Sequence, residues 1–171
     1  MEIIPPTKNP VVPYVPSPDL VVVHMLAVAG LQPTDVLYDL GSGDGRIVIM
    51  AAKLYRARAF GYEINPDLVA KSRENIKKSK VENLATVEQR DIYRLDLRRG
   101  SVITLYLSVE ANLKLLPQLE KMRPGSRIVS HQFPIPGFKP RVTDKVQVAD
   151  EQGVIRDHLI YVYTIPLEPA P

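Results

Sequence analysis

The sequence VLYDLGSGDGR at residues 36–46 predicts a buried strand that runs into a glycine-rich turn, and the apolar residues 47–54 predict a helix directly after it. Glycine has no Cβ, so the backbone can turn sharply here and approach a ligand closely. The first turn of the helix would direct free N–H groups at whatever occupies the turn. A strand, a glycine turn and a helix in this order predict a site for a nucleotide-type cofactor.

The acids beside the turn indicate which cofactor it binds. A dinucleotide-binding turn spaces its glycines as G-x-G-x-x-G and places a pyrophosphate on the helix N-terminus. Here Gly41, Gly43 and Gly45 are spaced differently, and Asp39 and Asp44 lie next to them. Two carboxylates would repel a pyrophosphate, but they suit the amine and sulfonium groups of S-adenosylmethionine. The pattern therefore predicts S-adenosylmethionine as the cofactor.

Two more acids end later predicted strands. Glu63 ends the strand predicted at residues 57–63, roughly 20 residues beyond the turn, where such folds place an acid on ribose hydroxyls. Asp91 lies at the end of the strand predicted at residues 85–92. It is placed to accept a hydrogen bond from the adenine amine, with Ile92 against the base. The alternative for Asp91 is an acid in a surface turn.

Length and composition restrict the class of protein. The chain has 171 residues, enough for one domain with a full α/β core, and it contains no cysteine. We therefore exclude disulfides, thiolate metal sites and a cysteine nucleophile, and we predict no bound metal. No apolar run approaches the ~20 residues of a membrane span and no signal-peptide pattern is present, so we expect a cytoplasmic protein without a membrane partner. The formal charge of +3 permits a nucleic-acid partner without implying one. Sixteen prolines fit a heat-adapted protein and an ordinary one equally well.

The order of the predicted elements indicates the fold. Predicted strands alternate with helices as far as residue 130, which favours a parallel sheet. Residues 145–148 and 155–165 then flank the turn sequence Asp150–Gly153, which predicts a hairpin. We expect a single α/β domain over residues 1–171. Its Rossmann-like sheet would combine parallel strands with one antiparallel strand from the C-terminal hairpin, and helices would cover both faces.

The N-terminal region is rich in proline and is predicted to be extended. We expect residues 1–10 to be disordered, residues 11–30 to form a lid segment and a helix, and residues 31–165 to form the cofactor-binding core. The apolar and aromatic residues 11–17 favour a lid over the alternative, a disordered arm. Ser17 is predicted to cap the helix, with Pro18 at its first position. Helical spacing predicts an inward face of Leu20, Val23, His24, Leu26 and Ala27.

Several motifs resemble a known family. DLGSGDGRIV at residues 39–48 and GYEIN at residues 61–65 resemble the cofactor motifs of class I S-adenosylmethionine-dependent methyltransferases. VPYVPS at residues 12–17 resembles the N-terminal motif of archaeal seven-strand protein-lysine methyltransferases, and LYLS at residues 105–108 stands where that group has a motif after its fourth strand. Eukaryotic relatives of that group methylate lysines of the mitochondrial ATP synthase c subunit and of the adenine nucleotide translocase. The resemblance implies a protein-lysine N-methyltransferase.

The motifs and this resemblance together assign residues to the cofactor. The expected cofactor-binding residues are Tyr14, Val15, Ser17, Asp39, Gly41, Ser42, Gly43, Asp44, Glu63, Ile64, Asn65, Asp91, Ile92 and Leu107. We expect the protein to act as a monomer on several proteins with accessible lysines, because one compact domain has little surface for reading a single partner.

The acceptor lysine must arrive neutral, because an ammonium group has no lone pair with which to attack a methyl group. An apolar aromatic entrance lowers the pKa of a lysine by desolvation. The candidates for this entrance are Tyr14, Tyr106, Leu107 and Phe133, and the expected catalytic residues are Tyr14, Tyr106 and Ser108. Ser108, Glu110 and His131 are weaker candidates for orienting the amine, with packing as an equal alternative. No residue is predicted to be a dedicated general base.

Two alternatives use the same fold. The first is an RNA or small-molecule methyltransferase. RNA would require a basic stripe with stacking aromatic residues, whereas aromatic residues make up only 6% of this chain. A nucleic-acid substrate is therefore disfavoured. The second alternative is a binding module that keeps the cofactor site but has a blocked acceptor pocket.

Overall fold

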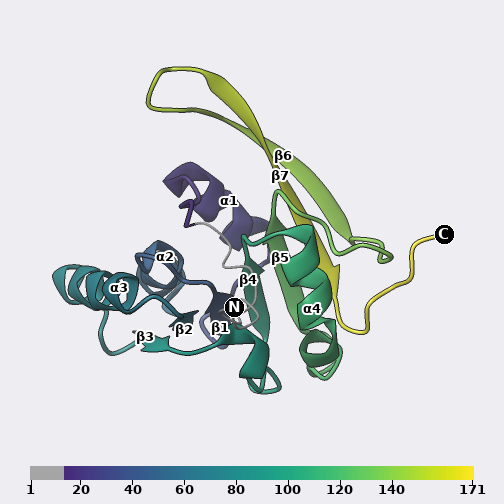
Figure 1. Cartoon of the computed structure of the whole chain (residues 1–171), viewed down its shortest axis with the longest axis horizontal. Coiled ribbons are helices and arrows are strands. Elements are labelled where there is room, and N and C mark those ends of the chain that lie inside the picture. The colour runs from purple at the N-terminus through teal and green to yellow at the C-terminus, as the bar shows by residue number, and fades with distance from the viewer. Residues whose placement is uncertain (1–13) are drawn as a thin grey trace, which may run out of the picture.

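The fold is a seven-stranded mixed sheet with helices on both faces (Figure 1). The computed structural model describes residues 14–171, so the expected disorder of residues 1–10 and the first part of the expected lid, residues 11–13, lie outside the described residues. The strands are β1 (Val36–Leu40), β2 (Arg58–Glu63), β3 (Ala85–Gln89), β4 (Val102–Leu105), β5 (Arg127–His131), β6 (Val142–Ala149) and β7 (Ile155–Thr164). The helices are α1 (Asp19–Val28), α2 (Arg46–Tyr55), α3 (Pro66–Lys78) and α4 (Val109–Leu119), with a 3-10 turn η1 (Ile92–Arg94).

The strand order is β3-β2-β1-β4-β5-β7-β6. The strands from β1 to β5 pair in parallel, and β7 pairs antiparallel with both β5 and β6. The predicted Rossmann-like sheet with a C-terminal hairpin is thus confirmed. All parallel strands end at one edge of the sheet, where ligands bind in folds of this kind. In the part of the chain that the structure describes, no helix is long and apolar enough to cross a membrane.

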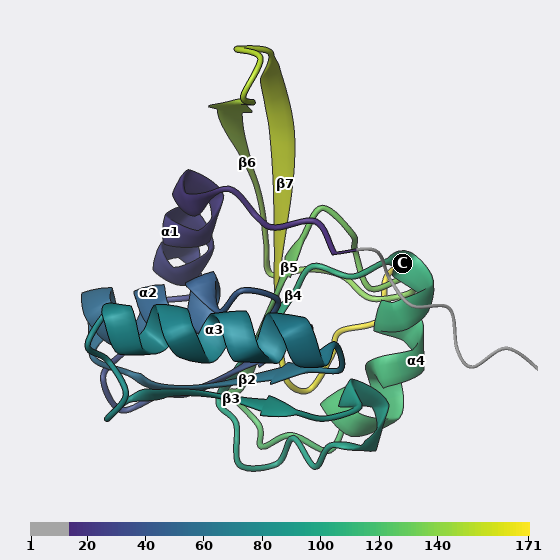
Figure 2. The same ribbon diagram turned by 60° about the vertical axis from the view of Figure 1, so that its left-hand side comes forward.

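Two apolar clusters hold the helices against the sheet. One packs α1, α2 and α3 on one face, and its members include Met25, Val48 and Ile76. The other packs α4 and η1 on the opposite face around Leu105 and Leu115. Figure 2 shows the two helical layers on either side of the strands. The parallel strands are therefore covered on both faces, and their C-terminal edge remains available for a ligand.

The C-terminal hairpin extends beyond the rest of the sheet (Figures 1 and 2). β5 pairs with residues 160–164 of β7, so within residues 14–171 the outer half of the hairpin has no further strand beside it. Helix α1 lies beside this hairpin, and His24 Nε2 contacts Asp144 Oδ2 on β6 at 2.8 Å. His24 is therefore a link between α1 and the hairpin.

The expected burial of Leu26 is confirmed, but the rest of the predicted inward face of α1 and its predicted cap were wrong. The buried residues are Val21, Val22, Met25 and Leu26, whereas Leu20 is 65% exposed and Val23 is 40% exposed. The helix is apolar on nearly every side, so its sequence does not define which face turns inward. Pro18 occupies the N-cap position without a side-chain hydrogen bond. The hydroxyl of Ser17 contacts His131 instead, because a buried imidazole needs a polar partner.

The α1 packing gives a prediction about stability. Met25→Ala should lower the free energy of unfolding by about 2–5 kcal/mol, because it removes a fully buried side chain and leaves a cavity. Leu20→Ala should change it by less than about 0.5 kcal/mol, because Leu20 is largely exposed. Urea unfolding of the two variants and the parent protein measures both values. Equal losses would contradict the observed orientation of α1.

Candidate cofactor and acceptor site

The glycine turn after β1 requires glycine at each of its three positions. Gly41, Gly43 and Gly45 have φ values of +80°, +56° and +84°, which side chains rarely adopt. A Cβ on Gly43 would overlap the ring of Tyr14, and a Cβ on Gly41 would lie 2.9 Å from Leu107 Cδ2. The turn thus brings its backbone against the N-terminal segment and against the loop after β4.

Glu63 holds the glycine turn against the end of β2. Its Oε1 accepts the backbone N–H of Gly43 at 3.0 Å, and its Oε2 accepts the backbone N–H of Asn65 at 3.0 Å. The backbone N–H groups of Gly41 and Ser42 also bond the carbonyl of Tyr62. Glu63 is buried, and its bond to Gly43 lies away from water, whereas its bond to Asn65 is partly buried. The acid predicted at the end of β2 is therefore next to the glycine turn, and its hydrogen bond to Gly43 fixes the backbone of the turn.

Asp39 is a buried carboxyl group behind the turn. It is 3% exposed and accepts a hydrogen bond from Thr104 Oγ1 at 2.8 Å. Burial, together with the weaker effect of the Glu63 and Asp44 charges, outweighs the opposing effect of the Thr104 bond and raises the pKa of Asp39 to about 7. The nearby Ser42 hydroxyl is buried without a hydrogen-bond partner among residues 14–171. This region therefore holds polar groups that a cationic ligand would stabilise.

Arg46 is a site residue that the sequence analysis missed. Its Nη2 bonds Asp44 Oδ2 at 2.7 Å, and its Nε bonds Asp44 Oδ1 at 3.1 Å. Burial disfavours ionised Asp44, but the hydrogen bonds from Arg46 outweigh this effect and hold the pKa of Asp44 below its usual value. Arg46 Nη1 also bonds the carbonyl of Ser17 at 2.9 Å. The spacing of Asp44 and Arg46 could have suggested their pairing, but nothing in the sequence indicates the contact with Ser17.

The N-terminal segment 14–17 lies against the glycine turn. The Tyr14 ring sits beside Gly43, and burial, followed by the charge of Asp44, raises the pKa of its hydroxyl. Tyr14 and Val15 are 45% and 57% exposed, whereas Ser17 is 4% exposed. Residues 14–17 therefore cover the turn from the outside and are fixed at Ser17.

Aromatic side chains gather beyond the end of β4. The Tyr106 ring lies 3.9 Å from the His131 ring between centroids, and it stacks with Phe133 at 6.1 Å. Burial raises the pKa of the Tyr106 hydroxyl. Ser108 Oγ accepts the backbone N–H of Ala111 at 3.1 Å and caps α4. Tyr106 and Phe133 are thus together as expected, while the Ser108 hydroxyl serves the helix.

His131 is fully buried and is bonded through both ring nitrogens. Its Nδ1 contacts Ser17 Oγ at 2.8 Å, and its Nε2 contacts His158 Nδ1 at 2.9 Å. Burial, followed by the nearby His158, lowers the pKa of His131 to about 4. The imidazole is therefore neutral near pH 7 and has no free nitrogen for a substrate. Glu110, in contrast, is exposed in the first turn of α4.

Asp91 and Ile92, expected at the adenine, follow β3, and the expected cofactor contacts Ile64 and Asn65 follow the neighbouring strand β2. Asp91 caps η1 by accepting the backbone N–H of Tyr93 at 3.0 Å, and Ile92 is partly buried beside it. Ile64 is 53% exposed, and Asn65 caps α3 with its side-chain oxygen. The exposed Ile64 and the partly buried Ile92 provide apolar surface at this edge.

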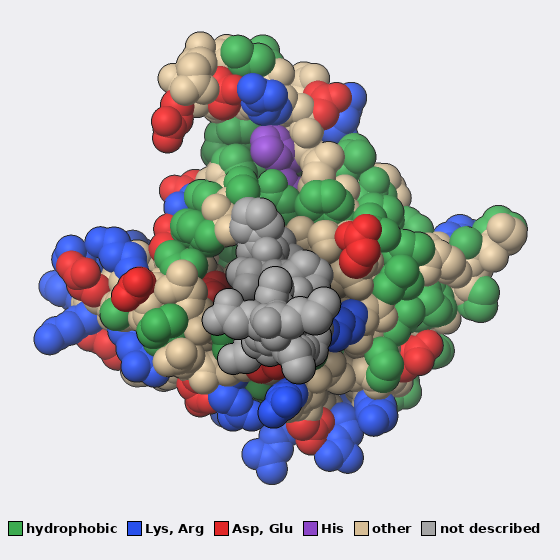
Figure 3. Space-filling view, viewed as in Figure 1, with side chains coloured by type: hydrophobic (Ala, Val, Ile, Leu, Met, Phe, Trp, Pro, Cys, Tyr) green, Lys and Arg blue, Asp and Glu red, His purple; other side chains and the backbone are tan. Residues whose placement is uncertain are grey.

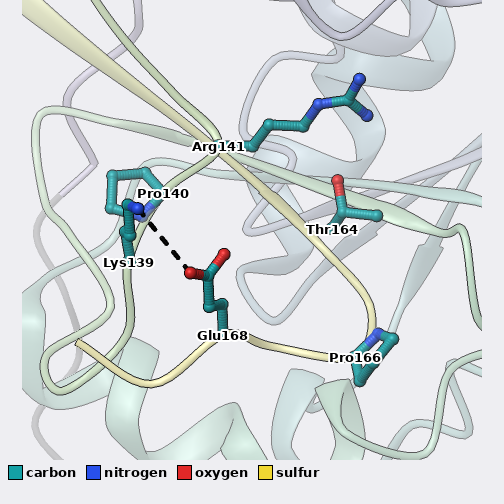
Figure 4. Close-up of a pocket in the computed structure, with 6 residues that line it drawn as sticks. All are labelled: Lys139, Pro140, Arg141, Thr164, Pro166 and Glu168. Carbon is teal, nitrogen blue, oxygen red and sulfur yellow. Dashed lines mark ion pairs between the residues drawn. The ribbon is translucent and has the colours of Figure 1, made fainter. Parts of the chain in front are cut away.

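Two hollows lie away from the aromatic residues beyond β4. A cavity of about 290 Å³ is lined by Lys139, Pro140, Arg141, Thr164, Pro166 and Glu168 (Figure 4). Thr164 pairs with Arg127, the first residue of β5, so this cavity lies at the opposite edge of the parallel strands from the glycine turn. A hollow of about 320 Å³ borders Asp44 and Arg46 on the side of α2 and α3. Neither hollow adjoins Tyr106 or Glu63.

Comparisons with known proteins find several methyltransferases. The model of the ANTKMT methyltransferase domain matches residues 39–142. A protein-lysine N-methyltransferase of Saccharolobus islandicus is 40% identical, with 91% of this chain and 95% of that protein covered. The adenine nucleotide translocase lysine N-methyltransferase of mouse is 32% identical, and the match covers 83% of this chain and 64% of the mouse protein.

A solved structure is also similar over nearly its whole length. It is the crystal structure of an RNA methyltransferase from Salinibacter ruber in complex with S-adenosyl-L-homocysteine, with 45% identity and a TM-score of 0.80. The match covers 92% of this chain and 97% of that one. The chain belongs to the ANTKMT family of S-adenosylmethionine-dependent methyltransferases.

Proposed function

We propose that the protein is a protein-lysine N-methyltransferase that acts on several proteins with accessible lysines. The observation that carries this proposal is the 40% identity to a protein-lysine N-methyltransferase of which 95% is covered. The aromatic pair Tyr106 and Phe133 beyond the ends of β4 and β5 supports it, because an apolar entrance favours the neutral form of an amine. The cytoplasmic location and the monomeric state stay predictions from the sequence.

We assign the cofactor to the glycine turn and the segments around it. When bound, S-adenosylmethionine supplies a methyl group on a positively charged sulfur. The Glu63 carboxylate would accept the ribose hydroxyls, Asp39 would face the positive charge, and Tyr14 would cover the turn. The other proposed contacts come from Val15, Ser17, Gly41, Ser42, Gly43, Asp44, Ile64, Asn65, Asp91, Ile92 and Leu107. Buried carboxyl groups, a hydroxyl without a partner and a backbone free of Cβ atoms fit a small cationic ligand.

The side chains beyond the end of β4 would bind the acceptor lysine and favour its neutral form. Tyr106 and Phe133 would surround the lysine stem and exclude water, which lowers the pKa of its amine and holds the neutral form in line with the methyl group. Tyr14, on the other side of the turn, would close the site from outside. The proton leaves the lysine before attack, and the geometry of His131 does not make it the base. The proton would pass to solvent before the lysine enters the aromatic entrance.

An RNA acceptor is the second candidate function, because the related Salinibacter ruber protein is described as an RNA methyltransferase. The charge distribution disfavours it. Lys and Arg side chains gather along the lower edge of Figure 3 with Asp and Glu among them. Ion pairs join Arg90 with Glu88, Arg98 with Asp96, Lys78 with Glu74, Lys145 with Asp157, and Arg156 with Asp150. These pairs reduce the net positive charge that a phosphate backbone would meet.

The proposed role of Glu63 gives a binding prediction. Glu63→Gln should weaken S-adenosyl-L-homocysteine binding by about 1–3 kcal/mol, because an amide disturbs two backbone hydrogen bonds and loses the ribose acceptor. Glu88→Gln, on the exposed surface of β3, is the matched control and should bind as the parent protein does. Isothermal calorimetry measures both affinities. Unchanged affinity of Glu63→Gln would remove Glu63 from the cofactor site.

The raised pKa of Asp39 gives a prediction about pH. The folded protein binds this proton more tightly than the unfolded chain, so the free energy of unfolding should fall as pH rises from about 4 to about 7. The contribution is at most about 4 kcal/mol. Asp39→Asn should lose this decline, because asparagine does not ionise and still accepts the Thr104 bond. Asp67→Asn, on the exposed start of α3, is the control. The free energy of unfolding is measured against pH by denaturant unfolding without cofactor. The same pH dependence in the parent protein and in Asp39→Asn would contradict a raised pKa of Asp39.

Transfer of a labelled methyl group tests the function itself. Purified protein incubated with methyl-labelled S-adenosylmethionine and cell extract should label material that protease removes and RNase leaves. Peptide mass spectrometry should then find methylated lysines in several proteins. Asp39→Asn should reduce this labelling, since it removes the negative charge next to the cofactor. Label that RNase removes, or label on arginine or glutamine alone, would refute the lysine assignment.

A further inference from the structure

Ser17 joins two parts of the site that lie on different elements. Its carbonyl accepts a hydrogen bond from Arg46, which belongs to the first turn of α2 and also holds Asp44. Its hydroxyl contacts His131 at the end of β5 at 2.8 Å. Ser17 is almost completely buried, although it follows the exposed Tyr14 and Val15. The N-terminal segment is therefore anchored at this residue, from the cofactor side and from the acceptor side.

His131 connects that anchor to the aromatic group. Its ring lies against the Tyr106 ring with 3.9 Å between centroids and 34° between the ring planes. His158, on β7, holds the opposite nitrogen at 2.9 Å. A neutral imidazole has one donor and one acceptor nitrogen, and both are used in this chain of bonds. One ring thus contacts the N-terminal segment, the aromatic entrance and the hairpin at once.

We propose that His131 is a positioning residue whose one ring holds both Ser17 and Tyr106. It thereby fixes residues 14–17 over the glycine turn and places Tyr106 in the acceptor entrance at the same time. This inference rests on the proposed function, because it treats Tyr106 as part of the acceptor entrance. Both ring nitrogens of His131 bond other side chains, so it would act through Ser17 on one side and Tyr106 on the other.

The Ser17 side is tested without any acceptor. Ser17→Ala removes the hydroxyl and leaves a buried His131 nitrogen without its partner, so its affinity for S-adenosyl-L-homocysteine should fall about tenfold. Ser17→Thr keeps the hydroxyl and should bind within about twofold of the parent protein. Calorimetry measures both dissociation constants. Parent-like affinity of Ser17→Ala, or equal weakening by both variants, would overturn the proposal.

The Tyr106 side is tested with a variant that separates the two contacts. His131→Asn keeps a polar group near the Nδ1 position and lacks the ring that supports Tyr106. Its cofactor affinity should stay within about threefold of the parent value, while kcat at saturating cofactor should fall about tenfold. His131→Leu should lose both properties, and if it does not fold, His131→Asn alone decides. Equal losses of affinity and kcat in His131→Asn would indicate a merely structural role and would overturn the proposal.

His24→Gln is the matched control, because His24 also joins the N-terminal region to the hairpin but contacts Asp144 rather than Ser17. It should keep both cofactor affinity and kcat within about twofold of the parent values. A loss in His24→Gln as large as in His131→Asn would overturn the specific role of His131. Failure of the lysine assignment would appear differently. The parent protein itself would not label protein, while Ser17→Ala would still bind S-adenosyl-L-homocysteine about tenfold more weakly than the parent protein.

Discussion

The Glu63 carboxylate determines the shape of the site, because it accepts backbone N–H groups from two directions. One bond comes from Gly43 in the turn after β1, and the other comes from Asn65 at the start of α3. A neutral or shorter side chain would leave at least one of these backbone donors without a full partner. The left-handed glycines, the N-terminus of α2 and the cap of α3 are all placed relative to this one carboxyl group. The proposed ribose contact therefore uses a group that the fold already needs.

The two aspartates beside the glycine turn, Asp39 and Asp44, lie in different environments. Arg46 neutralises Asp44, whereas the buried Asp39 accepts a hydrogen bond from the uncharged Thr104 hydroxyl. Two aspartates five residues apart in sequence thus differ in charge near neutral pH, one with a lowered pKa and one with a pKa of about 7. A cationic cofactor would meet a carboxyl group that is only partly ionised before binding. Its positive charge would then favour the ionised form.

Much of the fold was predictable, because the signals are local. The glycine turn, the acid that ends β2 and the hairpin turn at Asp150–Gly153 each depend on residues close together in the chain. The aromatic pair Tyr106 and Phe133 was predictable because parallel strands end at one edge of the sheet. The orientation of α1 was not, since an apolar helix has no polar face to mark its outer side. The partners of Ser17 were also missed, because Arg46 and His131 are distant in sequence and only the folded sheet brings them to it.

The contact between His24 and Asp144 also affects the outer border of the sheet. β6 is the last strand, so one row of its backbone groups faces no further strand among residues 14–171. An uncovered row of this kind can recruit a second chain, and proteins oppose this with charged side chains. Asp144 and Lys145 place one charge on each face of β6, and a one-residue slip against β7 would turn Asp144 away from His24. The contact between His24 and Asp144 therefore keeps β6 in register with β7, and the charges of Asp144 and Lys145 discourage a second molecule from pairing with the edge of β6.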